Sequence, residues 1–212
     1  AARQTVAPRH HILYNRDMFY IVGLGNHGEK YQNTRHNVGW IVCDYVRDKA
    51  GFSSLHDDRS MSGRVSEGAI GGVAARMLYP DTFMNNSGSA VVKFVPKNEL
   101  QNLIVIHDDI DLPLGEIKLG KGRGDGGNNG IKSVIEKLGT KDFMRIRIGI
   151  APRSFWTGEV KRPKGGGPLE KFVLKPFTRS EEAKLEEVKE RAYAALQETL
   201  LHGLEIAMNK YN

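Results

Sequence analysis

Short apolar runs, each bounded by glycine or by polar residues, recur along the chain. The first run, residues 19–22, is Phe-Tyr-Ile-Val and is closed by Gly23. A second run, residues 103–106, is Leu-Ile-Val-Ile and leads directly into His-Asp-Asp at residues 107–109. Continuous apolar runs of this length predict short buried strands.

Two other patterns predict a hairpin and a two-faced strand. Residues 64–69 and 73–78 flank Gly71-Gly72, which is a hairpin signal. Residues 144–150 alternate apolar side chains with Arg145 and Arg147. Because successive side chains of a strand point to opposite faces, both arginines are expected on the face opposite the isoleucines.

Apolar residues at helical spacing lie between these strands, and turn or capping residues mark their ends. We expect helices at residues 37–50, 82–95 and 129–138, which stop at Gly51, Pro96 and Gly139, and a long acidic helix that opens with the Thr178–Glu181 capping box and runs toward residue 209. Residues 152–168, rich in Pro, Gly and Lys, are expected to form a loop. Strands that alternate with helices predict one α/β domain with a partly parallel sheet.

Composition narrows the class of protein. The chain has 212 residues, of which 40% are hydrophobic and 26% charged, so it suits one globular domain and not a disordered chain. One cysteine permits neither an internal disulfide nor a cysteine-based metal site. No apolar run reaches about 18 residues, so no membrane association is expected. Residues 1–17 lack sustained periodicity and are expected to be an extension (leader, cloning remnant or tail) of a domain spanning residues 18–212.

The positive charge is confined to one part of the sequence. The formal net charge is +6. Residues 1–115 carry 12 basic and 12 acidic side chains, residues 116–179 carry 15 and 6, and residues 180–212 carry 4 and 7. Cations concentrated on a glycine-rich stretch indicate a polyanionic partner such as nucleic acid, although a merely solvated basic surface gives the same count.

Residues 23–28 match the G-x-G-x-x-G pattern of dinucleotide-binding loops, and Asp44 lies at the spacing of a ribose-binding acid. That motif requires a helix starting at the third glycine and an acid after the next strand. Here residues 29–36 have no apolar stripe and Asp44 lies inside a predicted helix, so we do not expect a nicotinamide or flavin site. The stretch instead places Asn26 at a strand end and His36 at a helix head, where a histidine suits proton transfer near neutral pH.

Five segments occur in an informative order. The first spans residues 21–39 and contains Ile-Val-Gly-Leu-Gly-Asn and Thr-Arg-His-Asn-Val-Gly. The others are residues 80–88, 107–115, 126–130 and 145–150. Together they resemble the bacterial-type peptidyl-tRNA hydrolases over about residues 19–209. The resemblance implies a monomeric three-layer α/β/α fold around a mixed sheet, no cofactor, and hydrolysis of the ester between a peptide and the terminal ribose of tRNA, with no metal.

The resemblance also implies a role for each polar residue of these segments. His36 matches the base that activates water, and Asp108 matches its acidic partner. Asn26, Asn85 and Asn129 match residues that hold the peptide portion and the scissile carbonyl. Amide side chains suit that task because each offers a donor and an acceptor without a charge to desolvate.

The remaining predicted contacts are with the substrate. Phe83 and Met84 are expected to wall the pocket, and Tyr31 to stack near the terminal nucleotide. Contacts to acceptor-stem phosphates are expected from Lys118, Lys121, Arg123, Arg145 and Arg147, with contributions from Lys161, Arg162 and Lys164. Such contacts give affinity without sequence choice, which suits an enzyme that accepts many tRNAs.

Two positions depart from the family pattern. His27 stands where the family usually has proline, and this change is expected to loosen the loop that holds Asn26. Asn128 stands where the family usually has histidine, which removes a ring able to order water or orient a neighbour. The 152–168 loop also looks longer than usual.

Two other functions fit parts of the sequence. A non-catalytic RNA-binding descendant of the family, similar to intron-splicing factors, would keep the fold and the basic face. A metal-dependent phosphoesterase would use His107, Asp108, Asp109 and Asp111 as ligands, since hard cations bind clustered carboxylates. For the hydrolase we expect a cytoplasmic location, with a mitochondrion or chloroplast as the alternative.

Overall fold

One mixed sheet of seven strands, in the order β2-β3-β4-β1-β5-β7-β6, forms the centre of the molecule. The computed structural model describes residues 18–154, 157 and 159–212, so the expected N-terminal extension lies outside the described residues. The parallel core comprises β1 (Phe19–Gly23), β4 (Val73–Pro80), β5 (Leu103–Pro113) and β7 (Met144–Ala151). The antiparallel flanks comprise β2 (His56–Asp58), β3 (Gly63–Ile70) and β6 (Ile117–Lys121).

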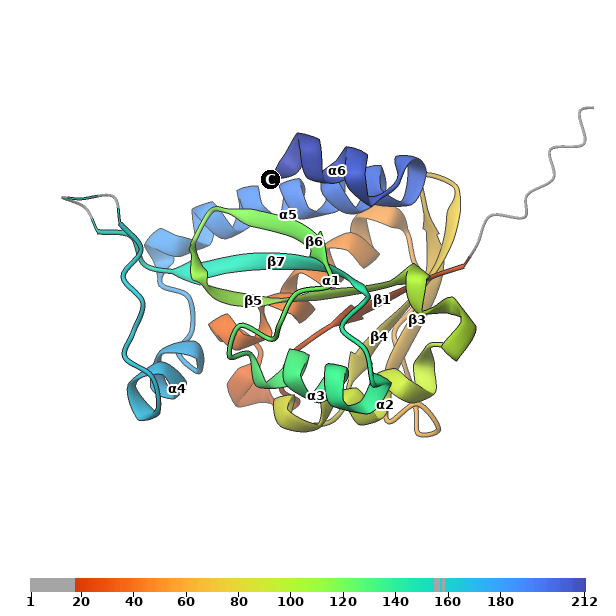
Figure 1. Cartoon of the computed structure of the whole chain (residues 1–212), viewed down its shortest axis with the longest axis horizontal. Coiled ribbons are helices and arrows are strands. Elements are labelled where there is room, and N and C mark those ends of the chain that lie inside the picture. The colour runs from red at the N-terminus through yellow and green to blue at the C-terminus, as the bar shows by residue number, and fades with distance from the viewer. Residues whose placement is uncertain (1–17, 155–156, 158) are drawn as a thin grey trace, which may run out of the picture.

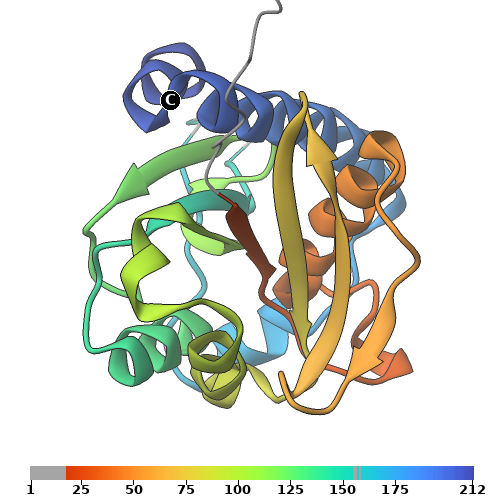
Figure 2. The same cartoon turned by 90° about the vertical axis from the view of Figure 1, so that its right-hand side faces the viewer.

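Helices cover both faces of this sheet (Figure 1). One face carries α1 (Val38–Ala50), α5 (Arg179–His202) and α6 (Leu204–Tyr211), and the other carries α2 (Ser87–Phe94) and α3 (Asn129–Leu138). The view turned by 90° shows the two helical layers on opposite sides of the strands (Figure 2). β5 serves both, because Ile104 and Ile106 belong to one apolar cluster while Leu103 and Val105 belong to the other. The expected three-layer α/β/α fold is confirmed.

The structure differs from the sequence prediction at two helices. The helix expected at 82–95 begins only at Ser87, after a 3-10 turn, η3 (Met84–Asn86). The long acidic helix opens with the predicted capping box of Thr178 and Glu181, but it is divided at Gly203 into α5 and α6. Gly203 has φ 91°, which is outside the helical region and accounts for the break.

Two strands and one α-helix of the described chain do not follow from the sequence patterns. The strands β2 and β6 are short, at 3 and 5 residues, and carry too few apolar residues to stand out. α4 (Gly167–Val173) begins within the last two residues of the predicted loop, with a proline in its first turn. It stands apart from the helical layers, beyond the carboxyl end of β7 (Figure 1).

A close backbone approach fixes the start of α1 beside the ends of β1 and β5. A Cβ atom at Gly39 would lie 2.5 Å from the carbonyl oxygens of both Ile106 and Leu24. A Cβ atom at Gly23 would lie 2.8 Å from the carbonyl oxygen of Gly39. Only glycine permits this packing, and it brings the turn η2 (Arg35–Asn37), directly before α1, to the carboxyl ends of the central strands.

Gly39→Ala is therefore expected to destabilise the fold. The added methyl group meets backbone atoms, which do not yield as a flexible side chain does, so the free energy of unfolding should fall by about 1–3 kcal/mol. Denaturant unfolding followed by circular dichroism measures the change. Gly167→Ala is the matched control, because no atom lies within 4 Å of a Cβ at that position. Equal stabilities of the two variants would contradict the packing argument.

Candidate active site

A cavity of about 620 Å³ opens at the carboxyl ends of β1 and β5. Eight of the residues predicted from the sequence line it: Asn26, Tyr31, His36, Phe83, Met84, Asn85, Asp108 and Asn129. Their segments lie far apart along the chain and meet here because the parallel strands end at the same edge of the sheet. Leu169 and Val173 of α4 supply an apolar wall that the sequence prediction assigned to no element.

His36 and Asp108 form a buried pair in this cavity. His36 Nδ1 lies 3.0 Å from Asp108 Oδ2, and the two residues are 9% and 4% exposed. Burial lowers the pKa of His36, but the adjacent Asp108 carboxylate raises it by more, so the net pKa lies above the ordinary value of 6.5. The imidazole is thus held by a carboxylate that favours its charged form.

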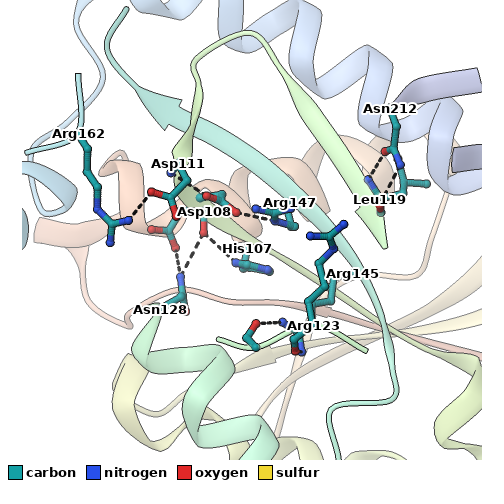
Figure 3. A network of polar contacts seen from close by, with 12 residues as sticks. His107, Asp108, Asp111, Leu119, Arg123, Asn128, Arg145, Arg147, Arg162 and Asn212 are labelled. Carbon is teal, nitrogen blue, oxygen red and sulfur yellow. Dashed lines mark hydrogen bonds and ion pairs between the residues drawn. The ribbon is translucent and has the colours of Figure 1, made fainter. Parts of the chain in front are cut away.

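Asp108 is itself held on several sides (Figure 3). Asn128 Nδ2 donates to Asp108 Oδ1 at 2.7 Å and to the Asp108 carbonyl oxygen at 3.2 Å. His107 Nδ1 lies 2.8 Å from the same carbonyl, so this nitrogen carries the proton. Burial lowers the pKa of His107 to about 4, which keeps its ring neutral near neutral pH.

Asn26 is clamped by its neighbours. Its backbone N–H donates to Asn37 Oδ1 at 2.8 Å, and Asn37 Nδ2 donates to the Asn26 carbonyl at 2.9 Å. The backbone N–H of Met84 donates to Asn26 Oδ1 at 2.8 Å. With its oxygen engaged, the side-chain amide of Asn26 is oriented, and its nitrogen has no protein acceptor among the described residues.

The other cavity residues divide between wall and rim. Met84 is 4% exposed and packs in the apolar cluster beneath α2 and α3, whereas Phe83 is 54% exposed. Asn85 and Asn129 are exposed at the rim, and Tyr31 is half-buried. The exposed ring of Phe83 lies against His27, with ring centroids 4.7 Å apart.

The residue before His36 is anchored to the last third of the chain. Arg35 Nη1 donates to the carbonyl oxygens of Lys175 at 3.1 Å and Pro176 at 2.8 Å. Its other terminal nitrogen donates to Glu181 Oε2 at 2.7 Å. Arg35 is only 5% exposed, so the turn that carries His36 is fastened to the segment between α4 and α5.

The cations predicted to contact phosphate lie outside the cavity lining, as far as the described residues show. Lys118 and Arg123 are exposed, and Lys121 is exposed with its Nζ 3.4 Å from Asp142. Arg147 is partly buried and its Nε lies 2.6 Å from Asp109 Oδ2. These side chains lie on or beside β6 and β7, next to the site.

Arg145 corrects one expectation. It is 3% exposed, and its guanidinium donates to the carbonyl oxygens of Gly124 at 2.7 Å and Arg123 at 2.6 Å (Figure 3). A side chain in that position does not reach a phosphate on the surface. Arg145 instead holds the glycine-rich loop of residues 122–128 against β7. This loop joins β6 to α3 and ends at Asn128, directly before Asn129.

The four residues of the phosphoesterase hypothesis do not converge on a common point. Asp109 pairs with Arg147, Asp111 pairs with Arg162, and Asp108 accepts from Asn128. Within the described part of the chain, no group of three or more His, Cys, Asp or Glu side chains is arranged to hold a metal ion. A search of the same residues finds no helix long and apolar enough to cross a membrane.

Comparisons with known proteins agree with this geometry. A family model described as peptidyl-tRNA hydrolase matches residues 20–212. The chain belongs to the peptidyl-tRNA hydrolase family. It is 40% identical to the peptidyl-tRNA hydrolase of Thermodesulfovibrio yellowstonii, over 92% of this chain and 99% of that protein. The relative from Carboxydothermus hydrogenoformans is 40% identical over 92% and 98%.

Solved structures of the family also resemble this chain. The crystal structure of peptidyl-tRNA hydrolase from Acinetobacter baumannii has a TM-score of 0.79 and 31% identity, covering 91% of this chain and 93% of that one. Family membership confirms the resemblance drawn from the sequence segments. The structure also excludes a dinucleotide-binding role for the G-x-G-x-x-G pattern, because Gly28 is followed by a 3-10 turn of only three residues and not by a dinucleotide-binding helix.

The roles of three residues at the site do not follow from the sequence. Nothing in the sequence indicates that Asn37, beside His36, clamps Asn26. The sequence suggests only a metal-ligand role for His107. Asn128 was noted as a departure from the family histidine, yet its contacts with Asp108 depend on a loop closing over 20 residues. Its one available signal was its place directly before a predicted helix, which suits a capping residue.

Proposed function

We propose that this chain hydrolyses peptidyl-tRNA, cleaving the ester between the peptide and the terminal ribose and so recycling the tRNA. The observation that carries this proposal is the buried His36–Asp108 pair in a cavity that four asparagines, Asn26, Asn85, Asn128 and Asn129, also line. The family membership supports the same reaction class.

His36 is the proposed base. Its Nδ1 faces Asp108, which leaves Nε2 to take a proton from a water molecule in the cavity. The Asp108 carboxylate fixes the tautomer and stabilises the imidazolium that forms as water attacks the ester carbonyl. An aminoacyl-type ester is already activated, so a positioned water and a base suffice.

The asparagines are proposed to hold the ester. Because Asn26 Oδ1 accepts from the Met84 N–H, its Nδ2 is directed to donate to a carbonyl oxygen. Asn129 stands in the first turn of α3, where the positive end of the helix dipole favours a developing oxyanion. Asn85 at the rim is proposed to bind the peptide, and Tyr31 and Phe83 to contact the terminal nucleotide and the apolar parts of the substrate.

The basic surface on β6 and β7 is the proposed docking site for the acceptor stem. Lys118, Lys121, Arg123 and Arg147 form it, and Arg145 supports it from beneath by holding the loop. Lys161, Arg162 and Lys164 are proposed to extend the surface. A monomer in the cytoplasm is part of the same proposal, and light scattering of the purified protein checks the monomeric state.

Removal of one surface cation should weaken tRNA binding and flatten its salt dependence. For Lys118→Ala we expect the slope of log affinity against log salt to fall by roughly 0.9, the value for one phosphate contact on a duplex. Titration of tRNA at several salt concentrations measures this slope. Lys184→Ala, which removes an exposed cation from the acidic helix α5, should leave the slope unchanged. Identical slopes in both variants would argue against docking on β6.

The proposed reaction is tested by mixing purified protein with a peptidyl-tRNA labelled in the peptide. We expect release of free peptide, unaffected by a chelator. Binding of the tRNA without release would support the non-catalytic RNA-binding alternative. Release that stops in chelator would support a metal-dependent reaction.

A further inference from the structure

Asn128 joins the catalytic carboxylate to the start of a helix. Its side-chain oxygen accepts from the backbone N–H groups of Gly130 at 3.0 Å and Ile131 at 3.1 Å, so it is the N-cap of α3. Its side-chain nitrogen donates to Asp108 Oδ1 at 2.7 Å. The residue is 9% exposed, and both ends of its amide are engaged.

The orientation of this amide is determined by its partners. The N–H groups of the helix accept nothing, so they require the oxygen, and the Asp108 carboxylate donates nothing, so it requires the nitrogen. An inverted amide would place like groups together on both sides. Asn128 therefore presents a fixed donor to Asp108, and because an amide does not titrate, that donor is present at every pH at which the protein is folded.

The two oxygens of Asp108 are then divided between two tasks. Oδ1 accepts from Asn128, and Oδ2 faces His36 Nδ1 at 3.0 Å. We propose that Asn128 is a positioning residue for the reaction, which holds the Asp108 carboxylate against His36 from the start of α3. This inference rests on the function proposed above and adds a residue that acts through Asp108 and does not touch the substrate ester.

Two substitutions separate this role from helix capping. Asn128→Asp keeps the cap, since aspartate and asparagine cap helices about equally well, but it replaces the donor to Asp108 with a second carboxylate. Asn128→His, which introduces the usual residue of the family, restores an N–H donor to Asp108 but provides a poor cap. If Asn128 positions Asp108, the first variant loses activity and the second loses stability.

The expected result for Asn128→Asp is a fall in kcat of roughly tenfold or more at a temperature well below the Tm of every variant, because a displaced base costs rate in protein that is still folded. For Asn128→His we expect a lower Tm, and a kcat that is reduced much less than in Asn128→Asp. An unchanged kcat in Asn128→Asp would overturn the proposal and leave Asn128 as a cap. Losses of kcat that simply follow the losses of Tm in both variants would overturn it as well.

A measurement without substrate keeps the test independent of the proposed reaction. The titration of His36 is followed by NMR in the resting protein, with His36→Ala used to assign its signal. Besides Asp108, the other titratable groups of the described residues that face the cavity are Tyr31, together with His107 and Asp109 on β5, Asp125 in the loop before α3, and Glu170 on α4. A second carboxylate beside Asp108 favours the imidazolium, so His36 should titrate at higher pH in Asn128→Asp than in the unmodified chain.

The outcomes of the two experiments are distinguishable. If the unmodified chain releases no peptide, the proposed function fails, and the NMR titration still decides whether Asn128 controls the Asp108–His36 pair. If the unmodified chain is active but the His36 titration and kcat are the same in Asn128→Asp, the positioning role fails and the function stands.

Discussion

Replacement of His36 by alanine should reduce peptide release by about 10²- to 10⁴-fold, the usual contribution of a positioned general base. Among the described residues, His107 is the one other imidazole that lines the cavity, and it is a much weaker base because burial lowers its pKa to about 4. The affinity for tRNA should change little, since the cations proposed to bind the acceptor stem lie outside the cavity lining. Single-turnover release of labelled peptide and a separate tRNA-binding titration measure the two quantities.

The matched control is His56→Ala. His56 is exposed on β2, at the edge of the sheet opposite β6, so its removal should affect neither quantity. A His36→Ala protein that releases peptide within tenfold of the unmodified rate would show that another group activates water. Equal losses of release and of tRNA binding would point to unfolding, which a melting curve would reveal.

Asp108→Asn should both slow the reaction and move its pH dependence. The base must be neutral to accept a proton, so kcat/KM falls as the pH falls through the His36 pKa, and in the unmodified chain this pKa lies above 6.5. In Asp108→Asn the carboxylate that raises the pKa of His36 is gone. Burial, which lowers this pKa, remains. The acid limb should therefore move to lower pH. The maximal rate should fall by about 100-fold or more, because the imidazolium is no longer stabilised.

A pH series of kcat/KM for both proteins checks this prediction. Asp111→Asn is the control on the same strand: this carboxylate is exposed, pairs with Arg162 and does not line the cavity. Its acid limb should coincide with that of the unmodified chain. An acid limb in Asp108→Asn at the same pH, or at higher pH, would contradict the assignment of Asp108 as the partner that sets the protonation of His36.

Local patterns predicted most of the architecture because they report burial directly. The strand at residues 144–150 and the helix at 129–138 with its stop at Gly139 appear as β7 and α3. The elements that the sequence did not predict are those whose formation depends on contacts with distant parts of the chain. β6 is ordered by pairing with β7, and α4 is a short helix of mixed composition next to the segment that holds Arg35.

The site shows the same limit. The family segments contain eight residues that line the cavity. They do not reveal which polar side chains are hydrogen-bonded to other parts of the protein and which are free to contact a substrate. Arg145 looked like a surface cation because it alternates with isoleucines. Whether such an arginine is exposed depends on the loop that folds across it, and here the carbonyl groups of that loop bury it.

The anchoring of Arg35 has a consequence for the order of events during biosynthesis. The groups that hold this arginine lie 140 and more residues further along the chain, at Lys175, Pro176 and Glu181. Contacts at such separation form late, because a long loop must close before they stabilise anything. While a ribosome is still translating the final third, the turn that carries His36 lacks these partners. The turn that carries His36, the proposed base, is therefore fully anchored only after the chain has been synthesised as far as Glu181.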